Sequence, residues 1–246
     1  MTLTAEAIQQ IYPQHPIRFY ERVDSTNDLA LEWLWQGTAA GSVIVADEQM
    51  QGRGRLGRTW HTPPGVALAV SVILRPAAAQ LPQVTMLGAL AIYDVLADFG
   101  VSQLGIKWPN DVQVNGRKIS GILPEAAWSG EQLVGVVLGL GLNVRVNFTG
   151  TELAETATSL ETVLGQSVSR LDVLARLLAN INDWAAALGE AWLFETWKSR
   201  LTTLGQPVTV GEIQGLAEQV NAEGALLVRD ASDVVHRVLA GDVALG

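Results

Sequence analysis

The chain has 246 residues, of which 48% are apolar and 17% charged, so it can bury a full core in one substantial domain with room for a small second one. It contains no cysteine, which excludes disulfides, thiolate metal sites and cysteine nucleophiles. Its formal net charge of −9 argues against general nucleic-acid binding, because neutralising phosphates requires a basic surface.

The beginning of the sequence lacks the charged segment of an export signal. The first basic residue is Arg18, and no apolar run is long enough to span a bilayer. We therefore expect a cytoplasmic protein with no membrane partner.

The first half of the chain predicts alternating helices and strands. Residues 25–36 (STNDLALEWLWQ) are typical of a helix that Ser25 or Thr26 opens, with Asp28 in its first turn. Apolar segments then predict two buried strands and a long buried helix that ends at Gly100. These elements span residues 42–48, 66–74 and 85–100.

A strand-rich block follows. In residues 111–123 (DVQVNGRKISGIL), Asn115 and Gly116 separate two alternating segments, which is the strongest short signal for a β-hairpin. A further apolar strand spans residues 133–144. Leucine, isoleucine and tryptophan at helical spacing predict one or two helices within residues 170–198.

The pattern of apolar and turn residues changes after Leu204. Short β-like pieces, separated by glycine and turn residues, replace the long apolar segments. We therefore expect a main domain over residues 1–204 and a small β domain over residues 205–246.

Residues 52–60 (GRGRLGRTW) place three arginines among three glycines directly after a predicted strand. Glycine lets backbone N–H groups approach a ligand, and arginine supplies paired donors for carboxylate or phosphate. We interpret the segment as an anion-binding loop that is mobile when empty and that a negatively charged ligand orders. The alternative is a solvated surface loop. The tripled charge and the terminal Trp60, whose ring can stack on a base or pack on the core, favour the anion-binding loop.

The predicted hairpin has one polar face. If Asn115 and Gly116 form a two-residue turn, strand alternation places Asp111, Gln113, Lys118 and Ser120 on that face. Lys118 then lies beside Gly121, where its ammonium group can neutralise charge on a phosphoryl or carboxylate oxygen in a transition state. The alternative is a cross-strand ion pair between Lys118 and Asp111 at a solvated edge.

Several further polar residues and glycines have adequate structural explanations on their own, namely helix capping, loop position and tight strand packing. Helix capping explains Ser25, Thr26 and Asn27, and a loop position explains Gln49. Tight strand packing explains Gly139, Gly141 and Asn143. The 3 histidines show no metal-ligand spacing.

Five motifs occur in order over residues 23–144: VDSTN, Q-x-x-GRGRLGRTW, KWPNDV, GRKISGIL and GLGLNV. Together they resemble the catalytic core of biotin protein ligases. The resemblance implies an α/β fold like that of class II aminoacyl-tRNA synthetases, with a mixed sheet packed against helices, followed by a small SH3-like β domain. It also implies two reactions. Biotin and ATP form biotinyl-5′-AMP and pyrophosphate, and a lysine of a biotin carboxyl carrier domain then attacks the mixed anhydride.

The resemblance assigns roles to residues around biotin. Those that match the biotin site are Ser25, Thr26, Asn27, Gln49, Gly121 and Gly139, with Arg53, Gly54 and Arg55 from the loop. Lys118 matches the lysine close to the reacting carboxylate and α-phosphate, so it belongs to this site as well. We expect Lys118 and Arg53 to be the catalytic residues, acting by positioning and electrostatic stabilisation.

The resemblance also implies a nucleotide site. Residues that match it are Arg55, Arg58, Lys107 and Asp111 at the phosphates, and Trp60, Asn110 and Asn143 at the adenosine. We expect Mg²⁺ to bind mainly through the phosphates of ATP, with Asp111 as the candidate protein ligand.

Some members of this family carry an N-terminal helix-turn-helix domain that binds DNA, but here the VDSTN motif begins at residue 23. We therefore expect a ligase without repressor activity or a DNA partner. The nearest alternative is a lipoate or octanoate ligase or transferase of the same fold. A nucleic-acid-binding module and an inert regulator are further alternatives. The carrier protein, the role of the small β domain and the oligomeric state, with a homodimer among the options, stay open.

Overall fold

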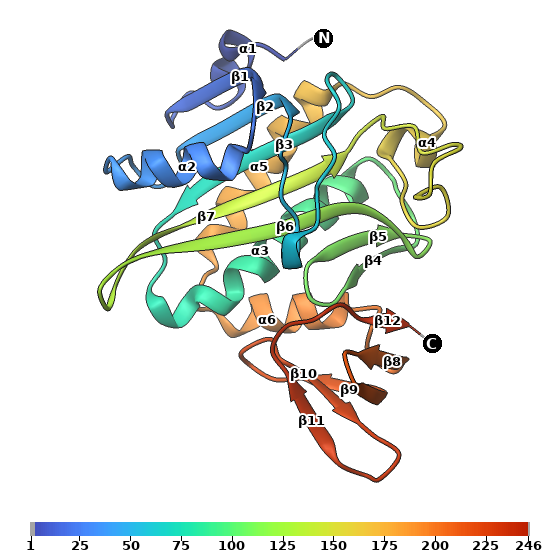
Figure 1. Cartoon of the computed structure of the whole chain (residues 1–246). Helices are drawn as coiled ribbons and strands as arrows, with labels where there is room; N and C mark the ends of the chain where they lie inside the picture. The colour runs from blue at the N-terminus through green and yellow to red at the C-terminus, as the bar shows by residue number, and fades with distance from the viewer. Residues whose placement is uncertain (1–2, 246) are drawn as a thin grey trace.

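The computed structural model describes residues 3–245 and contains two β-sheets (Figure 1). The larger sheet has seven strands in the order β1-β2-β3-β7-β6-β5-β4. Its strands are β1 (Ile17–Val23), β2 (Val43–Gln49), β3 (Ala67–Leu74), β4 (Leu104–Lys107), β5 (Asp111–Val114), β6 (Arg117–Ser129) and β7 (Gln132–Asn143). The sheet is mixed, because β1 and β2 are parallel and the other neighbouring strands are antiparallel.

Helices cover both faces of this sheet (Figure 1). They are α1 (Ala5–Ile11), α2 (Thr26–Trp35), α3 (Leu81–Asp98), α4 (Leu160–Leu164), α5 (Arg170–Ala186) and α6 (Ala191–Ser199), with short 3₁₀ turns η1 (Arg55–Gly57) and η2 (Ala78–Gln80). Alternation along β2 separates the two faces: Val43 and Val45 join the core that includes α3 and α5, whereas Ile44 joins Ala30 and Leu34 of α2. No helix within residues 3–245 is long and apolar enough to cross a membrane.

Most of the predicted elements are present. The two predicted strands correspond to β2 and β3, and the one or two helices predicted within residues 170–198 are two, α5 and α6. The long helix α3 begins four residues earlier than expected, at Leu81 rather than Thr85. Pro82 lies in its first turn, where its missing N–H leaves no hydrogen bond unmade.

The predicted hairpin forms, with a register that is partly wrong. Asn115 and Gly116 adopt φ values of 51° and 74°, as the turn requires, and Gln113 pairs with Lys118 as expected. A bulge then shifts the register, so that Asp111 lies opposite Gly121 instead of Ser120. Ser120 is therefore not on the polar face, and its buried hydroxyl donates to the Gly141 carbonyl at 2.6 Å.

The smaller sheet is antiparallel and lies beside α6 (Figure 1). Its order is β11-β10-β9-β8-β12, from β8 (Pro207–Val210), β9 (Ile213–Val220), β10 (Leu226–Arg229), β11 (Val235–Val238) and β12 (Ala244–Leu245). Trp108, at the end of β4, is buried and donates from Nε1 to the Gly224 carbonyl at 2.8 Å. We propose that the domain boundary lies between residues 204 and 205, because β8 starts two residues later.

Candidate active site

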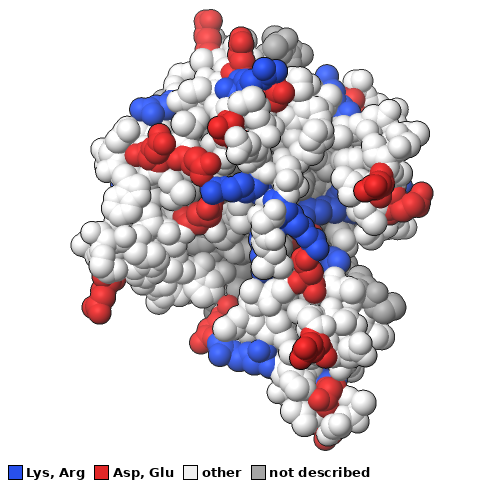
Figure 2. Space-filling view, viewed as in Figure 1, with Lys and Arg blue, Asp and Glu red and all other residues white. Residues whose placement is uncertain are grey.

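A pocket opens between α2, the loop over residues 50–61 and the middle of β6 and β7. Its lining includes Ser25, Thr26, Asn27, Gln49, Arg53, Gly54, Arg55, Arg58, Trp60, Asn110, Asp111, Lys118, Gly121, Gly139, Gly141 and Asp242. Figure 2 shows Lys and Arg side chains gathered across the middle of this face, with Asp and Glu beside them. The arginine loop is therefore not an isolated surface loop, because its side chains line a concave site.

A second pocket adjoins the first. Its lining includes Arg58, Trp60, His61, Lys107, Asp111, Lys118, Asn143, Phe148, Leu153, Glu155 and Thr156. Arg58, Trp60, Asp111 and Lys118 line both pockets. Every residue predicted for biotin or nucleotide binding lines at least one of the two. The structure thus brings the predicted residues together, with Lys118 at the junction.

Buried polar groups at the start of α2 form a network in the lining of the first pocket. The side-chain oxygen of Gln49 accepts from the Thr26 backbone N–H at 2.9 Å and from its hydroxyl at 3.0 Å. Ser71 Oγ on β3 lies 2.7 Å from Asn27 Oδ1. Ser25 holds the N-cap position without a side-chain capping bond. Helix capping therefore does not account for Thr26 and Asn27.

The loop is a closed hairpin. Its strands are joined by bonds from the Gly54 N–H to the Arg58 carbonyl at 2.7 Å and from the Trp60 N–H to the Gly52 carbonyl at 2.8 Å. A Cβ atom on Gly52 would lie 2.3 Å from the Trp60 carbonyl oxygen, so this position accepts glycine only. The turn at η1 places Leu56 at a φ of 55°. Glycine at position 52 thus allows two backbone segments of the loop to approach closely, whereas the sequence predicted an approach of the glycine backbone to a ligand.

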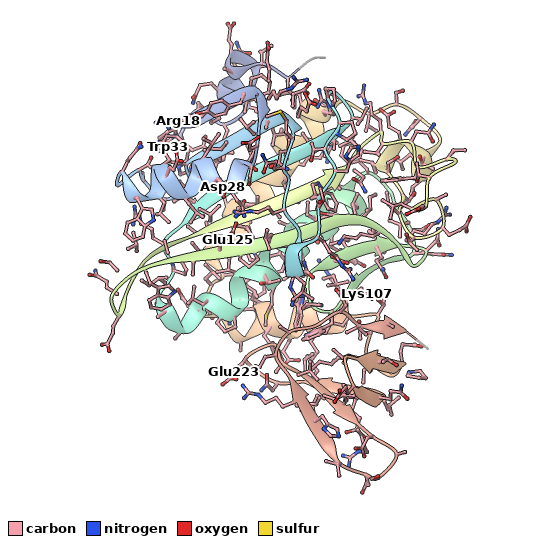
Figure 3. The ribbon with its side chains drawn as sticks, viewed as in Figure 1. Arg18, Asp28, Trp33, Lys107, Glu125 and Glu223 are labelled. Carbon is pink, nitrogen blue, oxygen red and sulfur yellow. The ribbon has the colours of Figure 1, made fainter. Side chains whose placement is uncertain are left out.

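Arg53 is held by two carboxylates. Its Nη2 lies 2.6 Å from Asp28 Oδ1 and 2.9 Å from Glu125 Oε2. Figure 3 labels both acidic residues, which come from α2 and β6. Neighbouring acidic groups thus offset the repulsion that the clustered arginines would otherwise experience.

Trp60 lies over glycines of the sheet. A Cβ atom on Gly141 would be 2.3 Å from Trp60 Cε2, and one on Gly121 would be 3.3 Å from Cζ3. The indole N–H of Trp60 is buried and has no hydrogen-bond partner within residues 3–245. Gly141 and Gly121 therefore create the space that the indole ring fills between the two pockets.

Lys118 forms the ion pair considered as an alternative from the sequence. Its Nζ lies 2.7 Å from Asp111 Oδ1 and 5.5 Å from the centre of the Trp60 ring. The pair does not lie at a solvated edge, however, because both residues line both pockets. The Lys118 backbone N–H is also fixed, by the Thr156 carbonyl at 2.8 Å. The ammonium group is therefore presented to both pockets.

The remaining arginines of the loop contact groups from distant segments. Arg55 Nη1 donates to Asn110 Oδ1 at 3.1 Å. Burial lowers the pKa of the Arg55 guanidinium below its ordinary value, while the carboxylates of Asp111 and Asp242 oppose that shift. Because arginine titrates far above neutrality, Arg55 stays charged. Arg58 pairs with Asp242, which precedes β12 of the smaller sheet.

Among the residues that sequence reasoning missed are Ser71, Glu125 and Asp242, each of which contacts a predicted residue of the site. Ser71 is the one polar residue in the buried strand ALAVSVIL, and Glu125 follows Gly121 on the same face by strand alternation. Both signals were available in the sequence. Asp242 had none, because only the packing of the smaller sheet brings it to the loop.

The sequence from 19 to 143 matches the model of the biotin/lipoate A/B protein ligase family. A bifunctional ligase/repressor, BirA, from Bacillus subtilis is 30% identical over 249 residues, covering 96% of this chain and 76% of the relative. The chain belongs to the biotin/lipoate A/B protein ligase family. The resemblance seen in the sequence motifs is thereby confirmed.

Two further members of this family are similar over most of their length. A biotin--[acetyl-CoA-carboxylase] ligase from Paracoccus denitrificans is 36% identical over 222 residues, covering 85% of this chain and 92% of the relative. A solved biotin protein ligase from Aquifex aeolicus, in complex with biotin and ATP, superposes with a TM-score of 0.78 at 28% identity, covering 94% of this chain and 98% of the other. The expected α/β ligase fold with its second sheet is thereby confirmed.

Proposed function

We propose that this chain is a biotin protein ligase, which activates biotin with ATP as biotinyl-5′-AMP and transfers it to a lysine of a biotin carboxyl carrier domain. The observation that carries the proposal is the junction at Lys118, where a pocket with a buried amide and hydroxyl network meets a second pocket. Similarity to a biotin--[acetyl-CoA-carboxylase] ligase and to a structure with biotin and ATP supports biotin and ATP as the substrates.

In the first reaction, an oxygen of the biotin carboxylate attacks the α-phosphorus of ATP, and pyrophosphate leaves with the electron pair of the broken P–O bond. The two reactants are both anionic, so they repel each other in water. Lys118 and Arg53 would neutralise the reacting oxygens, while Arg55, Arg58 and Lys107 face the phosphates. Positioning and charge neutralisation then supply the catalysis, without a protein nucleophile.

The residues of the site fit a magnesium ion bound chiefly by the nucleotide. No group of three or more His, Asp and Glu residues within residues 3–245 could hold a metal ion. Asp111 offers one carboxylate where the two pockets meet, and Mg²⁺ is often held by one or two carboxylates together with substrate phosphates and water. When bound, the ion would neutralise phosphate charge. Asp111 also pairs with Lys118, so it orients the lysine in the same place.

In the second reaction, the amine of the carrier lysine attacks the carbonyl carbon of biotinyl-5′-AMP. An amide bond forms, AMP leaves with the electron pair of the anhydride bond, and the amine loses a proton. The hairpin over residues 50–61 lies across the pocket, so it would shield the reactive anhydride from water until the carrier arrives.

The proposal is tested by incubating the purified chain with labelled biotin, MgATP and a purified carrier domain. We expect label on the carrier only when ATP is present, and pyrophosphate release that depends on biotin and is abolished by a chelator of Mg²⁺. Parallel reactions with lipoate and octanoate test the other branch of the family, whose model covers both kinds of ligase. Pyrophosphate release with lipoate or octanoate but not with biotin would overturn the assignment.

A further inference from the structure

We propose that Glu125 is a positioning residue that couples the biotin pocket to the arginine loop, by holding the amide of Asn27 and the guanidinium of Arg53 with one carboxylate. This inference rests on the proposed function, because it concerns how that site is organised. Glu125 was absent from the residues predicted from the sequence.

The strand β6 places Glu125 at the site. Residues 121, 123 and 125 alternate onto one face of the strand, and Gly121 and Leu123 both line the first pocket. The Glu125 side chain keeps 28% of its surface exposed, so its carboxylate lies outside the apolar core, in contact with Asn27 and Arg53 of the pocket lining. It can therefore contact both a buried polar group and a group of the loop.

On its buried side, Glu125 fixes the orientation of the Asn27 amide. Asn27 Nδ2 donates to Glu125 Oε2 at 2.5 Å and to the Leu123 carbonyl at 3.2 Å, so both of its hydrogens have acceptors. Asn27 Oδ1 lies 2.7 Å from Ser71 Oγ. A flipped amide would direct its oxygen at the carboxylate and at the carbonyl. The amide can therefore take only one orientation while Glu125 is ionised.

The space around Asn27 makes that orientation matter for the pocket. A Cβ atom on Gly139 would lie 2.3 Å from Asn27 Oδ1, so the amide packs directly against the backbone of β7. Asn27 and Gly139 both line the pocket that we assign to biotin. A change in the Asn27 amide would therefore change the wall of the biotin site.

On its exposed side, Glu125 fixes Arg53. Arg53 Nη2 lies 3.1 Å from Oε1 and 2.9 Å from Oε2 of Glu125, and 2.6 Å from Asp28 Oδ1. Among these contacts, Oε2 of Glu125 receives both Asn27 and Arg53. Asp28 contributes an ion pair to Arg53 alone. Glu125 thus joins the wall of the pocket to the loop, and Asp28 provides a natural control.

The test compares E125Q with D28N. Each substitution removes one negative charge from Arg53 and preserves the length of the side chain. In E125Q one acceptor oxygen becomes an amide donor, which cannot accept from Asn27 or from Arg53. We expect the Kd for biotin, measured by calorimetry without ATP, to rise about tenfold in E125Q, because a buried donor of Asn27 loses a charged acceptor. In D28N it should stay within about twofold of the parental value.

Both substitutions should also speed the loss of biotinyl-5′-AMP from the enzyme, because each weakens the hold on Arg53. The KM for ATP should stay within about twofold in both variants, since the contacts described for Glu125 and Asp28 are with Asn27 and Arg53, which we assign to biotin. A merely structural role for Glu125 would instead raise the Kd for biotin and the KM for ATP together. Thermal unfolding identifies variants that are not folded, and E125D, which keeps the charge, replaces E125Q if that variant fails to fold. Because E125D shortens the side chain by a methylene group, it should lose one of the two contacts, and with it either biotin affinity or adenylate retention.

An unchanged Kd for biotin in folded E125Q or an equal rise in E125Q and D28N would overturn the coupling, as would E125D matching the parent in both measurements. These outcomes are distinct from failure of the proposed function. If the parental chain releases no pyrophosphate with biotin and ATP, the function is wrong. If the parental chain is active and E125Q behaves as the parent does, only the role of Glu125 is wrong.

Discussion

At the scale of single residues, the role that we propose for Lys118 depends on where its ion pair lies. The pair with Asp111 has the geometry of an ordinary cross-strand salt bridge, and such pairs contribute little to stability when exposed. Here the Lys118 side chain is 34% exposed and faces two pockets, so its charge is available to a ligand. An anionic ligand bound here would replace Asp111 as the partner of the ammonium group.

Replacing Lys118 with alanine should reduce the rate of biotinyl-5′-AMP formation by about a hundredfold or more, because a fixed positive charge at the reacting oxygens is lost. The melting temperature should change little. The rate is measured as pyrophosphate release in a single turnover. Arg117→Ala removes an exposed charge from the preceding residue of β6 and serves as the control. Adenylation at the parental rate in Lys118→Ala would contradict the role.

Replacing Arg53 with alanine should weaken retention of biotinyl-5′-AMP, because the loop loses its link to α2 and β6 through Asp28 and Glu125. The measurement is the rate at which labelled adenylate leaves a preloaded enzyme. Arg22→Ala removes an exposed arginine that pairs with Glu48 away from the pocket, and should retain the adenylate like the parent. Equal retention in Arg53→Ala would refute the account of the loop.

At the scale of elements, the loop and the sheet are fitted to each other through glycine. Trp60, at the end of the loop, rests where Gly141 and Gly121 leave room on β7 and β6. The same ring lines both pockets, so the packing of one side chain sets the boundary between them. A methyl group on either glycine would act on the loop rather than on the sheet alone.

Gly141→Ala should raise the KM for ATP and destabilise the protein by about 1–3 kcal/mol, because its methyl group would displace Trp60. Gly135→Ala is the matched control. Gly135 lies on β7 like Gly141, but far from the loop, and a Cβ atom there would lie 2.8 Å from Leu34 Cδ1 of α2. This substitution should cost a similar amount of stability and leave the KM for ATP unchanged. Steady-state kinetics measures the KM for ATP of both variants, and thermal unfolding measures their stability. An unchanged KM for ATP in Gly141→Ala would contradict the role of Trp60.

The elements also show which features of the fold a sequence can predict. The hairpin was predictable because Asn115 and Gly116 suit a left-handed two-residue turn. The register beyond it was not, because the bulge that pairs Asp111 with Gly121 depends on neighbouring strands. Alternation nonetheless puts Glu125 on the face of Gly121, so that residue was within reach of the same reasoning.

At the scale of the whole molecule, the two sheets share one site. Asp242 lies between β11 and β12 of the smaller sheet and lines the first pocket, where it pairs with Arg58 of the loop. The sequence left the role of this domain open, and the pair between Asp242 and Arg58 shows that the segment before β12 contributes to the lining of the site. No local pattern predicts this contact, because it arises from the packing of distant segments.

Asp242→Asn should lower the KM for ATP about two- to threefold, because it removes a negative charge that competes with phosphate for Arg58. The effect should shrink as salt is added, since both side chains are largely exposed. Asp233→Asn, which removes an exposed carboxylate paired with Arg229, is the control and should leave the KM unchanged. A higher KM for ATP in Asp242→Asn would mean that the carboxylate holds Arg58 in place for the nucleotide.

The bond between Trp108 and Gly224 has a practical consequence for anyone who wishes to divide this protein. A polypeptide ended at Leu204 would keep every motif of the ligase core, yet its buried Trp108 would lose the carbonyl that accepts from its indole N–H, next to Lys107, which we propose contacts the phosphates of ATP. Shortening the enzyme in this way would yield an aggregation-prone fragment with a distorted site rather than a minimal catalyst.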